Sequence, residues 1–420
     1  MENTSLIESL SRTKEKAAEI EDALQRSAEA SSQLDIQREV YRAFACSGSK
    51  IFFIVKSLQT LCHMYQFSLA SFLLLYNQAL SAPIESKHVD ERLLKLCNDI
   101  EVRVLYFVGR ALVKSDRAMF SLYLVKGMHN DHFQPREWEI FVGSLVVSVD
   151  DITALRNYPS WAPSDRQAAF QLLSEQLPHL ISSLELDNVS KWQRFSSSLE
   201  AEKDIPAIRG ISPFQRVLLV QALRPDRLHS AILNFCCELL RIDAVSPPPL
   251  SLTALLEEGS AATPVLLISS PGADPSKELQ EFAVKAVGAG SYDELAMGGG
   301  QQEVALRLLR SAAMNGTWLC LKNLHLVAAW LPNLEKELSS LDAAPTFRLW
   351  LTSEAHSLFP SILLQQSLKV AYESPPGIKK NLQRAFDGWD ADYFSTDNPV
   401  KCKLLFLLAV FHAVTKPVTS

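Results

Sequence analysis

Hydrophobic and polar positions follow a heptad pattern in the first part of the chain. Residues 1–42 are charged and contain no proline or glycine, and their seam positions alternate spacings of four and three residues. The clearest apolar members of this seam are Leu6, Leu10, Ile20 and Leu24. Such spacing is typical of a coiled coil. Because the seam weakens after Leu24, it fits one long helix, an antiparallel hairpin that turns near residues 29–32, or a solvated surface helix.

The next part of the chain, up to residue 250, has the pattern of packed helices. Residues 49–80 are apolar nearly all round, which predicts a buried helix pair. A further helical stretch with one apolar side is expected over 87–127, and two more helices within 165–200. A helix pair within 213–242 follows. A proline cluster at 246–249 then gives the clearest boundary in the chain.

After this boundary, apolar runs of strand length alternate with helical patterns. The predicted strands are 264–270, 292–297, 317–324, 347–353 and 367–373. The predicted helices are 276–287, 301–314, 328–341, 357–365, 378–387 and 399–415. Alternation at this spacing predicts βαβ units and a mainly parallel sheet. The fold class is therefore mixed: a mostly α-helical N-terminal half, expected as a coiled-coil hairpin plus a helical bundle, precedes an α/β P-loop-like parallel sheet and a helical lid.

Composition narrows the function classes. The chain has 420 residues, enough for two to four domains, and its 15 glycines favour helices over turn-rich β structure. A net charge of −6 argues weakly against nucleic acid or an anionic membrane as a broad-surface partner. Seven cysteines without a C-x-x-C pair suggest reduced thiols in a cytosolic protein. The most apolar runs are too short for membrane insertion.

The loop after the first predicted strand has the layout of a phosphate-binding loop but lacks its chemistry. A working loop needs G-x-x-x-x-G-K-[ST], because backbone N–H groups, a lysine and a hydroxyl must face phosphate and Mg²⁺. One glycine remains here, no lysine follows it, and Asp274 would repel phosphate. The residues of this degenerate loop are Pro271, Gly272, Ala273 and Asp274. They suggest a nucleotide-fold module that serves as a structural part.

Several stretches resemble dynein heavy chains and occur in the order of that family. They are 64–80, 221–228, 270–275, 315–338, 347–353, 372–382 and 404–414. Within the family, 321–325 and 373–377 resemble the cytoplasmic type 2 heavy chains, whose motor carries retrograde intraflagellar transport in cilia. The resemblance implies the end of the fifth AAA module and most of the sixth, in a chain that looks cut at both ends.

The resemblance also implies a role for each segment and for the whole. Residues 1–42 would be a buttress-like coiled coil that props the stalk, 43–82 the fifth module's small helical subdomain, 83–250 a helical lead-in, 251–375 the α/β core of the sixth module, and 376–420 its truncated lid. Implied partners are the rest of the ring and the stalk, microtubules indirectly, and dynein intermediate, light intermediate and light chains. Implied locations are the cytoplasm, the cytoskeleton and the cilium or flagellum.

For an AAA+ site, the resemblance points to positions whose residue types have changed. The strand that should end in Asp-Glu, for Mg²⁺ and the attacking water, is followed here by Lys322 and Asn323. Thr352 lies where a sensor residue would, and Lys379 opens the lid helix where a sensor arginine could lie. The simpler interpretation is that Asn323 and Thr352 only satisfy strand ends. We expect no catalytic residue, no metal and no cofactor here; ATP and Mg²⁺ would bind other modules.

Two weaker signals leave alternatives open. Pro225 and Asp226 suit the first turn of a helix, but Arg224 or Arg227 could instead pair with a neighbouring module. A possible metal-ligand set is more simply a solvated loop: His129, Asp131 and His132. Two other function classes remain possible, a stand-alone degenerate P-loop nucleotide-binding protein and a helical adaptor unrelated to motors. Nucleotide-dependent melting would separate the first from a structural segment.

Overall fold

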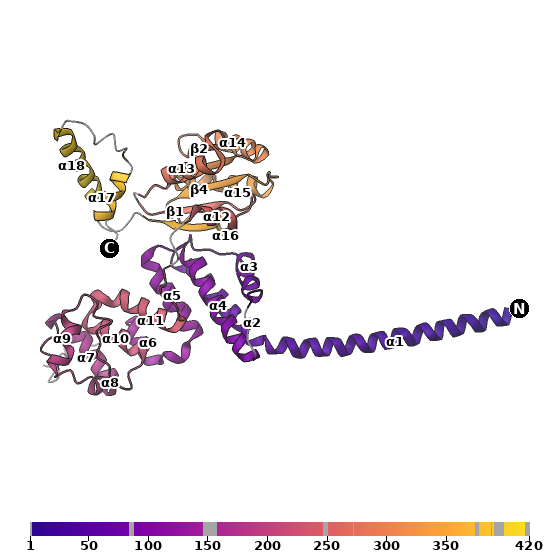
Figure 1. The fold of residues 1–420 in the computed structure, drawn as a ribbon, viewed down its shortest axis with the longest axis horizontal. Coiled ribbons are helices and arrows are strands. Elements are labelled where there is room, and N and C mark those ends of the chain that lie inside the picture. Colours follow the sequence, from indigo (N-terminus) through magenta and orange to yellow (C-terminus); the bar gives the residue numbers. More distant parts are fainter. Residues whose placement is uncertain are drawn as a thin grey trace.

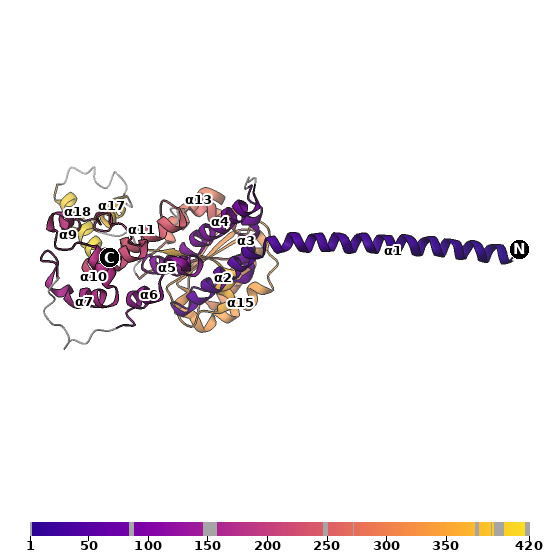
Figure 2. The same ribbon diagram turned by 90° about the horizontal axis from the view of Figure 1, so that it is seen from below.

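The described residues form a long helix, a helical body, a sheet domain and a final pair of helices (Figure 1). This computed structural model describes residues 2–83, 88–145, 158–246, 251–271, 273–373, 378–387, 389 and 399–415. The long helix is α1, Glu2–Val40, and it projects away from everything else in both views (Figures 1 and 2). Because α1 runs unbroken through residues 29–32, the single long helix is correct and the predicted hairpin does not form.

The helical body begins one residue after α1 ends, with only Tyr41 between them. Its helices are α2 Arg42–Ser57, α3 Leu69–Leu80, α4 Val89–Gly109, α5 Lys114–Met128, α6 Pro135–Val142, α7 Gln167–Gln176, α8 Pro178–Ser183, α9 Val189–Ser197, α10 Pro213–Leu223 and α11 Leu228–Leu240. Short 3-10 turns link several of them. The predicted pair within 213–242 is confirmed, with its break at Arg224 and a 3-10 turn over Pro225–Arg227. The stretch 165–200 holds three helices rather than two.

Helices α2 and α3 pack closely but are not buried all round, so that prediction was only partly right. Gly48 makes the approach possible, because a Cβ there would lie 2.6 Å from the ring of Tyr76. On the other faces Phe53 is 62% and Leu74 56% exposed. The buried residues of α2 and α3 share one core with α4 and α5. The proposed boundary between 43–82 and 83–250 therefore divides a continuously packed body, and the assignment of its halves to two modules stays a prediction.

The sheet domain has five parallel strands in the order β2-β3-β4-β1-β5, as the alternating pattern predicted. The strands are β1 Val265–Ser269, β2 Tyr292–Ala296, β3 Trp318–Lys322, β4 Arg348–Ser353 and β5 Leu368–Tyr372. The helices are α12 Leu252–Glu258, α13 Ser276–Val287, α14 Gln302–Asn315, α15 Leu331–Ser339 (after a 3-10 segment, Leu324–Trp330) and α16 Ser361–Gln366. Each predicted strand is confirmed to within two residues at either end.

Helices cover both faces of the sheet. One face carries Leu267, Trp318 and Trp350 against residues of α12 and α13. The opposite face carries alternate residues of the same strands, such as Leu266 and Leu351, against residues of α14, α15 and α16. A parallel strand buried on two faces needs apolar side chains at successive positions, which explains the continuous apolar runs of β1 and β3. The edge strand β2 differs, because its Asp293 and Glu294 are exposed.

Two helices follow the sheet, α17 Ile378–Asp387 and α18 Pro399–Thr415, with the predicted bounds. They pack against each other beside the sheet domain (Figure 1). Much of α18 is apolar and exposed: Leu404 is 61%, Leu407 60% and Phe411 67% exposed. Within the described part of the chain, no helix combines the length and the apolar character needed to cross a membrane.

Candidate functional site

The carboxyl ends of β1, β3 and β4 lie side by side, which is where open α/β sheets bind ligands. The loop after β1 supplies Pro271, Ala273 and Asp274, while Asn323 follows β3 and Thr352 lies near the end of β4. These strands are neighbours in the sheet, so the fold gathers the predicted residues at one edge. Gly272, which the sequence also placed in this loop, lies outside the described residues.

Asp274 is used to start helix α13. Its Oδ1 accepts a hydrogen bond of 2.9 Å from the backbone N–H of Ser276, the first residue of that helix. A helix N-terminus attracts anions through such free N–H groups, and here the protein's own carboxylate takes that place. Glu278 adds a second acid in the same turn and accepts a hydrogen bond of 2.7 Å from the hydroxyl of Tyr372. Two carboxylates therefore lie at the start of α13.

Thr352 and Asn323, which lie on and just after neighbouring strands, are joined by a hydrogen bond. Thr352 is 3% exposed, and its Oγ1 accepts a hydrogen bond of 3.1 Å from the backbone N–H of Asn323. Asn323 has a left-handed backbone with φ of 59°, a conformation that asparagine tolerates better than most residues. This geometry matches the structural interpretation, in which both residues satisfy strand ends.

Two lysines named from the sequence complete the list of predicted residues at this edge. The Nζ of Lys322, where an acidic residue would hold Mg²⁺, forms an ion pair of 2.9 Å with Glu294 on β2. Lys379 is exposed in the first turn of α17, and among the residues that the structure describes no hydrogen bond or ion pair joins it to the loop. Lys322 is therefore engaged by a carboxylate rather than free to meet a phosphate.

Arg224 and Arg227 are engaged within the chain. Arg224 donates to the carbonyls of Phe195 and Ser196 at 3.0 Å each and to the carboxylate of Asp226. Arg227 binds both oxygens of Glu202, at 2.7 and 2.9 Å, and the Glu202 side chain is 3% exposed. This arginine lowers the pKa of Glu202 below its ordinary value through their hydrogen bond. The contact with a neighbouring module stays a prediction, and it would require these bonds to be given up.

His129 has a partner that the sequence did not reveal. Its Nε2 lies 2.9 Å from Oε2 of Glu101, a residue 3% exposed on α4, and this hydrogen bond raises the pKa of His129. His132 lies 3.6 Å from Asp131 in the adjoining turn. The described residues contain no group of three or more potential ligands that could hold a metal ion.

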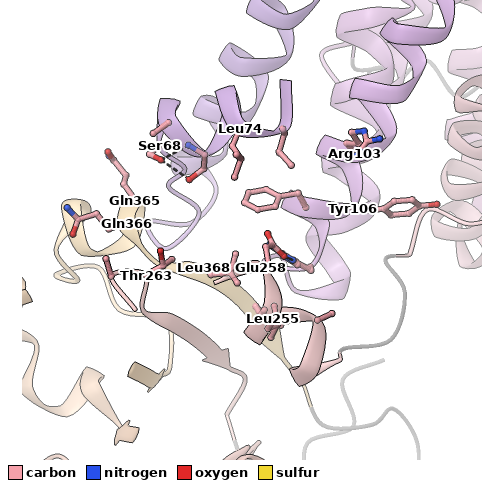
Figure 3. A pocket seen from close by; sticks show the side chains of 18 of the residues that line it. Ser68, Leu74, Arg103, Tyr106, Leu255, Glu258, Thr263, Gln365, Gln366 and Leu368 are labelled. Atoms are coloured by element: carbon pink, nitrogen blue, oxygen red, sulfur yellow. Dashed lines mark hydrogen bonds and ion pairs between the residues drawn. The ribbon is translucent and has the colours of Figure 1, made fainter. Parts of the chain in front are cut away.

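A cavity lies elsewhere, between the helical body and the β5 edge of the sheet (Figure 3). It has a volume of about 1270 Å³, and we term it the β5-edge cleft. Its lining includes Leu74, Arg103, Phe107, Arg110, Glu258 and Leu368. Sequence reasoning missed all of them as site residues. The one signal nearby was a lysine inside an apolar strand, Lys369, which is 4% exposed and donates to the carbonyl of Leu364 at 2.6 Å.

Comparison with known proteins gives a consistent family. Residues 260–371 match the family described as "Dynein heavy chain region D6 P-loop domain". The chain is 44% identical, over 98% of its length, to cytoplasmic dynein 2 heavy chain 1 of Tripneustes gratilla and to that of Homo sapiens. It is 30% identical over 99% of its length to the human dynein axonemal heavy chain 10. The chain spans about a tenth of the length of the first two relatives.

Proposed function

Because the chain belongs to the dynein heavy chain family, we propose that it is a non-hydrolysing, structural and force-transmitting part of a motor's AAA+ ring. The carboxyl edge of the sheet supports this proposal. Asp274 fills the place of an anion, Thr352 and Asn323 bind each other, and Lys322 is paired with an acid. Hydrolysis of Mg–ATP needs carboxylates for the metal and the water at the end of a strand, and the positions that follow Leu321 in β3 hold Lys322 and Asn323 instead.

For the whole protein we propose ATP-driven, minus-end-directed movement on microtubules, in the form of retrograde intraflagellar transport. The support is the similarity to relatives named cytoplasmic dynein 2 heavy chain 1. ATP and Mg²⁺ would then bind other modules of the ring. The partners would be the remaining ring and stalk, microtubules indirectly, and dynein intermediate, light intermediate and light chains. The protein would work in the cytoplasm and in the cilium or flagellum.

Force transmission is supported by the joint between the helical body and the sheet domain. The backbone N–H of Ala371, on the edge strand β5, donates to the carbonyl of Arg110 at 2.7 Å. The guanidinium of Arg110 in turn binds both oxygens of Glu258 on α12. A third contact joins His63, whose Nε2 lies 2.7 Å from the carbonyl of Phe359. These bonds let a displacement of the sheet domain move the body, and with it α1, which would act as the buttress.

Phosphate release from Mg–ATP by the 420-residue chain tests the catalytic part of the proposal. We expect no turnover above the buffer control, with a known ATPase as the positive control for the assay. The variants Asn323→Ala and Thr352→Ala should give the same zero rate. Turnover that persists through purification and is abolished by either variant would contradict the proposal. Turnover that is lost on purification would identify a contaminating enzyme instead.

A further inference from the structure

Helix α5 begins without a cap of its own. The residue before its first turn is Val113, whose side chain has no polar atom and forms no capping hydrogen bond. The first N–H groups of a helix have no partner inside that helix, so they bind water or acceptors from elsewhere in the protein. Two residues outside α5 supply such acceptors here. They are Glu373, directly after strand β5, and Tyr65, in the segment between α2 and α3.

Glu373 caps α5 from the sheet domain. Its two carboxylate oxygens accept from the backbone N–H of Lys114, the first residue of α5, at 3.2 and 3.3 Å. The guanidinium of Arg117 lies 3.8 Å from the same carboxylate, and these two side chains are only 17% and 14% exposed. The positive end of the helix dipole and the arginine both favour a carboxylate at this place. Because Lys114 and Glu373 are 259 residues apart, the cap joins the helical body to the sheet domain.

Tyr65 completes the same helix start. Its hydroxyl accepts from the backbone N–H of Val113 at 3.3 Å and donates to the carboxylate of Asp116 at 2.8 Å. Tyr65 is buried, so these bonds replace the water that its hydroxyl would otherwise bind. The end of β5 and the segment between α2 and α3 therefore meet at the first turn of α5. All the hydrogen bonds of this turn form only while both segments are docked on it.

The other end of α5 packs against the helix that follows α1. Gly127, the next-to-last residue of α5, lies so close to α2 that a Cβ there would overlap Cδ1 of Ile54. Ile51 and Val55 of α2 are buried in the core that α2 shares with α5. Interiors packed this closely have low compressibility and transmit strain. Because α2 follows α1 after a single residue, α5 connects the sheet domain to the base of α1.

We propose that Glu373 is an interdomain latch, which caps α5 while the sheet domain is docked and leaves the first turn of α5 frayed when that domain moves away. The inference rests on the proposed force-transmitting function and names a contact that carries it. Burial lowers the pKa of Arg117, and the Glu373 carboxylate opposes this shift. Opening the latch would thus deprive both the Lys114 N–H and a partly buried guanidinium of their acceptor, which favours the docked state.

Amide hydrogen exchange of the 420-residue chain, measured by mass spectrometry, tests the latch. Glu373→Ala should raise the exchange rate of residues 114–117 by about tenfold, because a charged acceptor is lost. Glu373→Gln keeps an acceptor for the Lys114 N–H but loses the charge, so it should raise the rate by only about threefold. Exchange in α10 and β3 should be the same in every variant, which would show that each one folds.

Exchange in α16 separates an interdomain latch from a local helix cap. This helix precedes β5, so it lies at the opposite end of that strand from Glu373, and its Gln365 contacts Gln66 of the helical body at 3.4 Å. If Glu373 holds the sheet domain on the body, Glu373→Ala should also raise exchange in α16, by about twofold to threefold. A local cap would change residues 114–117 alone.

Glu337→Ala is the matched control. Glu337 binds Arg310 at 2.5 and 2.9 Å within the sheet domain, so its loss should leave exchange in α5 and α16 unchanged. The latch is overturned by unchanged exchange of residues 114–117 in Glu373→Ala, by an increase that spares α16, or by equal increases in Glu337→Ala. None of these results bears on turnover of Mg–ATP, so the latch can fail while the non-hydrolysing role stands.

Discussion

The sheet domain and helix α1 both carry regular apolar residues, yet these end in opposite environments. Trp350 and Leu266 in the sheet are fully buried, while Ile20 and Leu24 on α1 are 60% and 65% exposed. The strands find helices on both faces, but no described helix lies along α1 (Figure 1). A periodic pattern therefore predicts the element, and a partner decides whether its apolar side is buried.

The largest change in the free energy of unfolding is expected from a substitution that creates a cavity in the sheet domain. Trp350→Ala should lower the free energy of unfolding by about 3–5 kcal/mol, because it removes a fully buried ring that packs against Trp318 and Phe282. The lower end is expected, since the indole Nε1 has no hydrogen-bond partner and its removal relieves that cost. Urea unfolding followed by circular dichroism gives the measurement. A loss below 1 kcal/mol would mean that the sheet core is not the stabilising centre.

A smaller effect is expected at the carboxyl edge of the sheet. Thr352→Val should cost about 1–2 kcal/mol, because the backbone N–H of Asn323 loses its acceptor. Thr352→Ser keeps the hydroxyl and is the matched control, so it should retain most of the stability. If valine and serine destabilise equally, the hydrogen bond does not carry the effect and the lost shape of the side chain does.

In the helical body, the ion pair of His129 with Glu101 should make the free energy of unfolding depend on pH. The pKa of His129 is raised above its ordinary value of 6.5 by the hydrogen bond to Glu101, so the ion pair stabilises the folded state fully below pH 6.5. This stability is lost as pH rises through the folded-state pKa. We expect His129→Gln to cost under ~1 kcal/mol at pH 5.5, because the pair is partly solvated, and progressively less at higher pH. Denaturant unfolding from pH 5.5 to 8.5 measures this; a gap that widens with pH would contradict it.

The smallest effect should come from α1 in the chain itself. Leu24→Ala should change the free energy of unfolding by less than ~0.5 kcal/mol, since the side chain is 65% exposed. In an intact motor the expectation reverses, because a partner helix would bury this seam. There, Leu10→Ala with Leu24→Ala should leave ATP hydrolysis intact while microtubule affinity stops responding to nucleotide. An unchanged response, with the mutant helix shown to be disordered, would leave α1 as a surface helix without the buttress role.

Most elements could be predicted from the sequence because their signals are local. Strand β1 is an aliphatic run between Pro264 and Pro271. Helix α10 begins at a capping box of Ser212 and Gln215 with Pro213 inside it. The degenerate loop was recognisable because a missing lysine is visible in the sequence. The Asp274 carboxylate takes the place of an anion by accepting a hydrogen bond from the backbone N–H of Ser276, and these two residues are only two positions apart.

The remainder could not be predicted because it depends on contacts between distant segments. One apolar side was expected over 87–127, yet Leu94 in this stretch is 72% exposed. Arg110 and Glu258, which meet in the β5-edge cleft, are 148 residues apart. Asn323, with its left-handed backbone, donates its N–H to Thr352, which is 29 residues away in the sequence.

Helix α1 can act as a lever arm for movements of the helical body. Its 39 residues correspond to a rod of ~58 Å. Its base is fixed through Tyr41 to α2, whose Ile51 and Val55 lie in the core of the helical body. A tilt of the body by ~10° would carry the far end of that rod through ~10 Å. A small rearrangement of packed helices is thereby converted into a displacement about as wide as a whole helix.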